Sequence, residues 1–214
     1  MRYEQLIIGF DAREMWLGLD TWSQETRRRF LLREDIEKPL STDTLVWRSL
    51  FRSNIFVISG QDITTGSVLD LEFPIEQRSI DNLWKDLGAM QAYLKRTPGL
   101  EGKAYWVIAI AELMSLEDKE ELKPTHPFKP LEVDPGWELL GFDVSQGNLR
   151  SGLSGEAYGD DDMEALRIRW SPHLNRYHLF SEEESADAFA DWADQADAGH
   201  APYSIYAIYR VDQQ

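Results

Sequence analysis

The sequence contains no cysteine, which excludes disulfide bonds, thiolate chemistry and metal sites with cysteine ligands. It also lacks a long apolar run, because the longest, Ala104 to Ala111, is far too short to cross a bilayer. The first residues, MRYEQLIIGF, have neither the basic region nor the cleavage site of a signal peptide. We therefore expect a cytoplasmic protein with no membrane partner.

Positive charge is scarce in this chain. It has 22 Lys and Arg against 38 Asp and Glu, a net charge of −16. Such a chain repels nucleic acid, since binding requires cations that neutralise phosphates, and it repels anionic membrane surfaces. The same charge attracts a basic partner and accelerates the encounter. Many acidic cytoplasmic proteins carry such charge for solubility alone, so the charge limits the partner classes without identifying one.

The sequence does contain enough apolar residues for a packed core. Of its 214 residues 43% are hydrophobic and 12% aromatic, and eight are tryptophans, which are costly to leave exposed. The length fits one large domain or two small ones. A segment with four prolines, 123–136, cannot be regular structure. We interpret it as a surface loop within a single domain, 1–214, because the strands on either side can share one sheet.

Apolar patterning predicts both strands and helices. Helices are expected at 23–38, at 80–94 with Ser79 as its cap, and after Ser181; strands are expected at 5–10, 54–59, 68–73, 103–112, 137–144 and 203–211. No segment recurs at a fixed period. The irregular alternation predicts an α+β fold with a mixed or mainly antiparallel sheet and helices packed on one face.

The best local signal is at the start of the last helix. Ser181 is the predicted N-cap, Glu184 its capping-box partner, and Phe180 precedes the cap, where it can pack on the first turn. The same helix is expected to turn Ala186, Phe189, Ala190 and Ala193 inward.

A glycine-rich stretch, GWELLGFDVSQGNLRSGLSGEAYGDDD at 136–162, raises the question of a catalytic or ligand-binding loop. It lacks the Lys-Ser/Thr of a phosphate loop. It also misses the nucleophile elbow by one residue, since Glu156 stands where a second glycine is needed after Ser154. We therefore expect these glycines to serve turns.

Metal binding is not predicted either. Three consecutive aspartates do not match the alternating ligands of a calcium loop and are typical of a negatively charged helix start. The four histidines, at 126, 173, 178 and 200, are expected in loops or the core. We expect no cofactor.

Negative charge is concentrated near the C-terminal end of the sequence. Between Asp160 and Asp197 eleven acids stand against three arginines, a net charge of −8. Positions 187, 191 and 194 fall on one helical stripe, where like charges repel one another and weaken an isolated helix. A folded protein tolerates such a stripe if it is merely solvated, or uses it if a cationic partner docks there. Trp192, off the apolar stripe, could anchor such a partner. The predicted partner-binding residues are Asp160, Asp161, Asp162, Glu164, Asp187, Asp191, Trp192 and Asp194.

The last eighty or so residues resemble a known class of protein. The strand GWELLGFDV is followed by SGLSG, WSPHLN, YHLF, an acidic helix and a closing aromatic strand. This order resembles bacterial immunity proteins that neutralise polymorphic or type VI secretion toxins. The resemblance implies one-to-one binding to a cognate toxin without catalysis, and acidic members commonly face basic nuclease toxins.

Two functions are therefore open. The first is an immunity or inhibitor protein that binds a basic, nuclease-type toxin through the acidic surface, and is not an enzyme. The alternative is a small hydrolase whose site combines Ser154, either His173 or His178, and an aspartate, since such triads depend on geometry rather than on sequence order.

Overall fold

The computed structural model describes most of the chain. The described residues are 3–16, 46–51, 71, 74–77, 79, 83–101, 105–115, 132–146, 150–153, 165, 166, 168–196, 199 and 201–211. The predicted helix at 23–38 and the predicted strand at 54–59 lie outside them. So do 123–131 of the proline-rich segment and all of 68–73 except Leu71.

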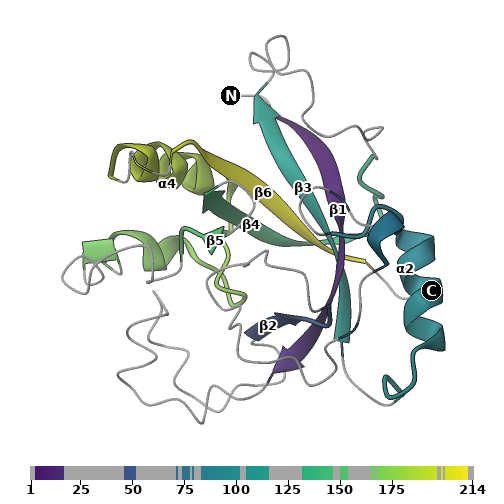
Figure 1. Cartoon of the computed structure of the whole chain (residues 1–214). Helices are drawn as coiled ribbons and strands as arrows, with labels where there is room; N and C mark the ends of the chain where they lie inside the picture. The colour runs from purple at the N-terminus through teal and green to yellow at the C-terminus, as the bar shows by residue number, and fades with distance from the viewer. Residues whose placement is uncertain are drawn as a thin grey trace.

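Six strands form one sheet in the order β2-β1-β3-β6-β4-β5, and every paired neighbour is antiparallel (Figure 1). The strands are β1 (Tyr3–Trp16), β2 (Val46–Ser49), β3 (Tyr105–Ser115), β4 (Glu138–Gln146), β5 (Arg150–Ser151) and β6 (Tyr203–Val211). Among the described residues the named helices are α2 (Leu87–Arg96) and α4 (Glu183–Ala196), with 3-10 turns η2 (Ile75–Gln77) and η5 (Ser171–His173). The predicted α+β class is confirmed. No helix of the described residues is long and apolar enough to span a bilayer.

Both helices bury their apolar sides in one cluster. Met90 and Leu94 of α2 belong to it, as do Ala186, Phe189, Ala190 and Ala193 of α4, which confirms the inward residues expected for that helix. Odd-numbered residues of β3, from Val107 to Leu113, join the same cluster. Even-numbered Ile108 and Ile110 instead belong to a second buried cluster on the other face. The strand alternation therefore places the helices on one face of the sheet, as predicted.

The two strands outside the central pair each contain a bulge at a glycine. Pairing with the neighbouring strand shifts register between Ile7 and Gly9 in β1, and between Leu139 and Gly141 in β4. A Cβ on Gly9 would lie 2.5 Å from the Cβ of Leu83. A Cβ on Gly141 would lie 2.8 Å from the Cβ of Leu179. Each bulge thus lets a loop approach the strand more closely than any side chain would permit.

The predicted start of α2 is wrong. The helix begins at Leu87 rather than near Ile80, and the side chain of Asp86 caps it by accepting from the N–H of Ala89 at 2.6 Å. The Oγ of Ser79 instead accepts from the N–H of Leu83 at 3.1 Å. An isolated β-bridge pairs Trp84 with Phe10 and so keeps Trp84 out of the helix.

The predicted cap of α4 is displaced by one residue. The first helical carbonyl is that of Glu182, which accepts from the N–H groups of Ser185 and Ala186. The N–H of Ser181 donates instead to the carbonyl of His173 at 3.0 Å. Phe180 packs against Phe189, with ring centroids 5.2 Å apart, and so does contact the helix that follows it.

Candidate partner-binding surface

The acidic helix α4 is held against the sheet by its aromatic and alanine side. It contacts β4 and β6, and Figure 1 shows it at the opposite end of the sheet from α2. Phe189 lies at the centre of this contact and meets Phe180 and Trp170 at centroid distances of 5.2 and 5.1 Å. The acids of α4 and its cap therefore stand on a rigidly packed helix: Glu182, Glu183, Glu184, Asp187, Asp191 and Asp194.

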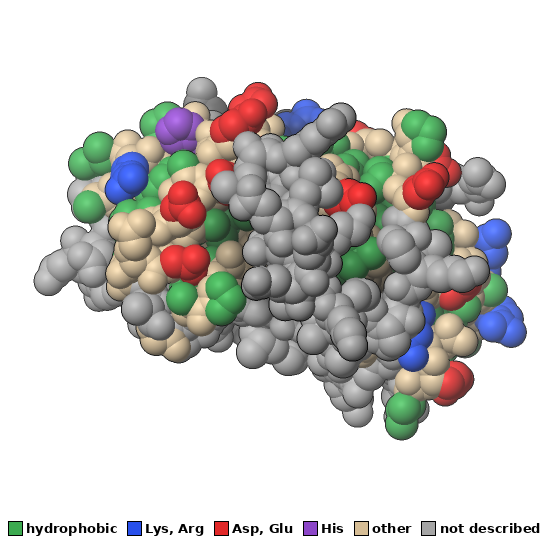
Figure 2. Space-filling model, turned by 90° about the horizontal axis from the view of Figure 1, so that it is seen from above, with side chains coloured by type: hydrophobic (Ala, Val, Ile, Leu, Met, Phe, Trp, Pro, Cys, Tyr) green, Lys and Arg blue, Asp and Glu red, His purple; other side chains and the backbone are tan. Residues whose placement is uncertain are grey.

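These acids differ in exposure. Glu182, Glu184 and Asp191 are exposed, whereas Asp187 and Asp194 are half-buried. Figure 2 shows acidic side chains at both ends of the face it presents, the α4 end included, and cationic side chains at both ends, chiefly at the end that carries α2.

Asp194 has a structural role. Its Oδ1 accepts from the N–H of Tyr203 at 2.7 Å, which ties the last turn of α4 to the first residue of β6. A charged acceptor strengthens such a bond and satisfies a backbone donor at the strand start. Asp194 therefore supports the fold in addition to carrying negative charge.

Trp192 is more embedded than the sequence indicated. Its ring is half-buried and packs on Phe189 and Trp170, at centroid distances of 5.4 and 6.1 Å. The guanidinium of Arg169 lies 4.6 Å above the ring of Trp170. Sequence reasoning missed this aromatic cluster, although the spacing of Phe189 and Trp192 by three residues is a helical neighbour signal.

Glu183, in the first turn of α4, is affected by both burial and neighbouring charge. Partial burial, followed by the nearby charge of Glu184 and, more weakly, that of Asp187, raises the pKa of Glu183 above its ordinary value, against an opposing effect of the N-terminal amino group. A cation placed beside these carboxylates would offset the part of this effect that comes from Glu184 and Asp187.

The remaining predicted site residues are only partly visible. Asp160, Asp161, Asp162 and Glu164 lie outside the described residues, as do Ser154, His126 and His200. The described residues contain no group of three histidines, cysteines or acids placed to hold a metal ion.

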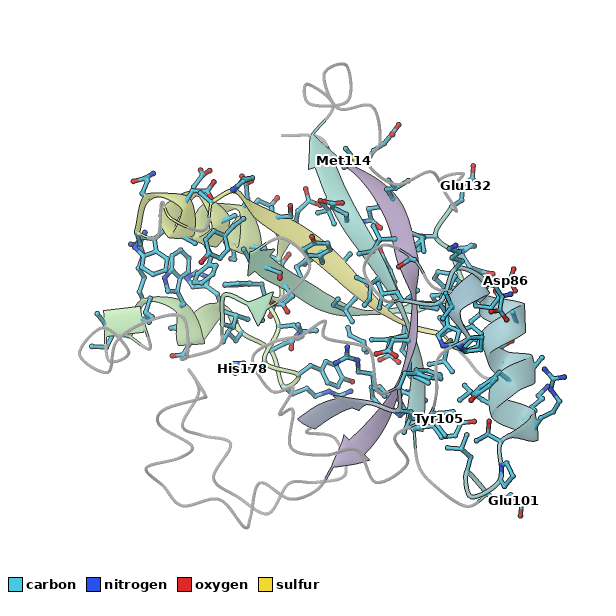
Figure 3. All side chains as sticks on the ribbon, in the orientation of Figure 1. Asp86, Glu101, Tyr105, Met114, Glu132 and His178 are labelled. Atoms are coloured by element: carbon cyan, nitrogen blue, oxygen red, sulfur yellow. The ribbon has the colours of Figure 1, made fainter. Side chains whose placement is uncertain are left out.

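The two described histidines occupy different environments. His173 is exposed, and its Nδ1 lies 3.1 Å from the Oγ of Ser185. His178, labelled in Figure 3, is fully buried on the segment between η5 and α4, with a positive φ of 59°. Because Ser154 is not described, the hydrolase alternative has no geometric support among the described residues.

The chain was compared with known protein families, curated proteins and solved structures. No protein-family model, curated protein or solved structure matches this chain. The interpretation of the surface therefore depends on the chemistry and geometry of the chain itself.

Proposed function

We propose that this protein is an inhibitor of the immunity type, which binds a basic protein toxin through the outward face of α4. One observation carries the proposal: no Lys or Arg occurs between Arg176 and Arg210, so the acids of α4 have no cation on their own helix. Repulsion among them disfavours the free helix, and a cationic partner converts that repulsion into attraction.

The packing of α4 against the sheet supports the same function. A surface that recognises a folded partner benefits from side chains held on a rigid element, because less conformational entropy is lost on binding. Phe189 and Ala193 are fully buried under the acids, and Trp192 offers the accessible part of a large aromatic ring next to Asp191. Acids around a tryptophan supply both electrostatic steering and an apolar contact.

The first experiment identifies the partner. Products of neighbouring genes are expressed one at a time, with and without this protein. We expect one product that arrests growth alone and is harmless when this protein is present, and that copurifies with it in a one-to-one complex. If no neighbouring product behaves so, and no protein copurifies stoichiometrically from the native lysate, the immunity proposal is wrong.

The second experiment tests the surface. We expect the double substitution Asp187→Lys and Asp191→Lys to weaken the complex by about 10- to 100-fold at low salt, because close charge pairs at interfaces carry that much. The matched control is Glu76→Lys with Glu101→Lys, which changes net charge equally at two exposed acids outside α4. Titration calorimetry at several salt concentrations gives the affinities. Equal affinities for the two variants across all salt concentrations would exclude α4 from the interface.

A further inference from the structure

The two bulged strands share a local structure as well as a sequence. IIGFDA at 7–12 in β1 corresponds to LLGFDV at 139–144 in β4, with the bulge glycine at the same place. In both strands the aspartate after Gly-Phe is fully buried. The Oδ1 of Asp11 accepts from the N–H of the next residue at 2.9 Å, and that of Asp143 does the same at 2.9 Å.

The loops that close on these strands also correspond. Trp84 pairs with Phe10 through two backbone hydrogen bonds, and Phe180 pairs with Phe142 in the same way. Four residues before the closing leucine, a polar side chain caps the turn. Ser79 Oγ accepts from the N–H of Leu83, and Asn175 Oδ1 accepts from the N–H of Leu179.

The same correspondence continues into the helices and the edge strands. α2 begins three residues after Trp84, and α4 begins three residues after Phe180. At the sheet edges, Arg13 pairs with Ser49 and Ser145 pairs with Ser151. The residue after each edge-strand serine donates its N–H to the bulged strand. Leu50, after Ser49, donates to the carbonyl of Ala12, and Gly152, after Ser151, donates to the carbonyl of Val144.

The central pairing fixes how the two sets are related. In the order β2-β1-β3-β6-β4-β5, the second three strands mirror the first three. Phe10 pairs with Ala109, and Phe142 pairs with Ala207, which makes Ile110 the equivalent of Ile208. These two isoleucines pair directly with each other in the antiparallel β3–β6 ladder. A two-fold axis through that pair exchanges β3 with β6 and reproduces the observed register on both sides.

We infer that the chain is a tandem duplication: residues 3–115 and 138–211 are two copies of one ββαβ unit, paired across a two-fold axis at Ile110 and Ile208. The β3–β6 ladder is then the interface that joins one unit to its copy. Connections of unequal length separate equivalent elements. Gly9 and Leu83 are 74 residues apart, whereas Gly141 and Leu179 are 38 apart, and this difference conceals any fixed period.

The first test exploits the capping position. In the second unit, Asn175 also donates from Nδ2 to the carbonyl of Leu140 at 2.7 Å, and Ile8 is the equivalent of Leu140. We expect Ser79→Asn to be tolerated, with Tm within about 3 °C of the parent, because the duplicated site provides the same carbonyl. Ser79→Leu, of the same size but without hydrogen bonds, should lower Tm by about 5–10 °C. Equal losses for the two substitutions would contradict the duplication.

The second test exploits the axis. The axis relates Leu113 to Val211 and Glu138 to Leu6, so the distance from Leu113 to Glu138 must equal the distance from Val211 to Leu6. A permuted full-length chain, opened within 116–131 and closed by a second copy of 116–137, should form the same sheet and unfold in one transition. The control has the same closure but is opened at Gly199, inside the second unit, and should be markedly less stable. Hydrogen exchange measures whether the backbone amides of β3 and β6 stay protected. If they lose protection in the permutant opened between the units, the inference is wrong.

Discussion

At the scale of single residues, the glycine of each bulge decides whether a loop can close on the sheet. Gly141 has a φ of 145°, and an added Cβ would lie 2.8 Å from both the Cβ of Leu179 and the carbonyl oxygen of Phe180. Neither neighbour is the flexible end of a side chain, so the clash can be relieved only by moving backbone.

Gly141→Ala should therefore destabilise the protein by about 2–4 kcal/mol, by adding backbone strain to loss of the close packing. Gly88→Ala is the matched control, because Gly88 is exposed in the first turn of α2 and a Cβ there meets only Asp86 Oδ1 at 3.4 Å. That control should stabilise by about 0.5–1 kcal/mol. Urea unfolding measures both values, and a small effect at Gly141 would show that the bulge does not need glycine.

The pKa of Glu183 gives a second prediction at this scale. Because folding raises that pKa, the folded state prefers the protonated form, and the associated stability is present at low pH and lost as pH rises through the folded pKa. Glu183→Gln removes the penalty. We expect the variant to be more stable than the parent at pH 7 and equal to it near pH 4, as measured by unfolding at both pH values. An advantage that is independent of pH would assign the effect to something other than charge.

At the scale of elements, α2 and α4 occupy equivalent places with different charges. Where α4 has Asp187 and Asp191, the corresponding positions of α2 carry Gln91 and Lys95. The ββαβ unit thus forms without acids at these positions. Asp187 and Asp191 are therefore a property of one copy rather than a requirement of the shared unit, which is what the proposed function needs.

The junction between α4 and β6 makes a separate prediction. Asp194→Ala leaves the N–H of Tyr203 without its acceptor and should cost about 1–3 kcal/mol, whereas Asp194→Asn keeps an acceptor oxygen and should cost less. Chemical denaturation of the three proteins gives the comparison. Equal stability of the alanine and asparagine variants would show that the hydrogen bond contributes little.

Elements with strong patterning were predictable from the sequence, and their termini were less so. The strand at 203–211 and the inward side of α4 follow directly from alternation and helical spacing. The start of α2 does not, because its sequence has helical spacing from Ile80 onward while the pairing of Trp84 with Phe10 belongs to a strand 74 residues away. Local periodicity contains no information about such a partner.

At the scale of the whole molecule, the duplication shows why the site was only partly predictable. Between the bulged strands, Gly-Phe-Asp is identical, but the two helices share almost no residues at equivalent positions. The acidic stripe could be located from charge and spacing. The burial of Trp192 and the role of Asp194 could not, since both depend on elements that meet only after folding.

The long-range pairing of β1 also has a consequence for synthesis. Ile7 of β1 pairs with Ala111 of β3, and the other edge of β3 is covered only by β6, whose residues begin at Tyr203. On the ribosome, β1 emerges about a hundred residues before β3, and the second edge of the apolar β3 stays unpaired until β6 appears. Folding dominated by such distant pairings is slow and leaves strand edges open to aggregation. Shielding of the nascent chain is thus most needed between the appearance of β3 and that of β6.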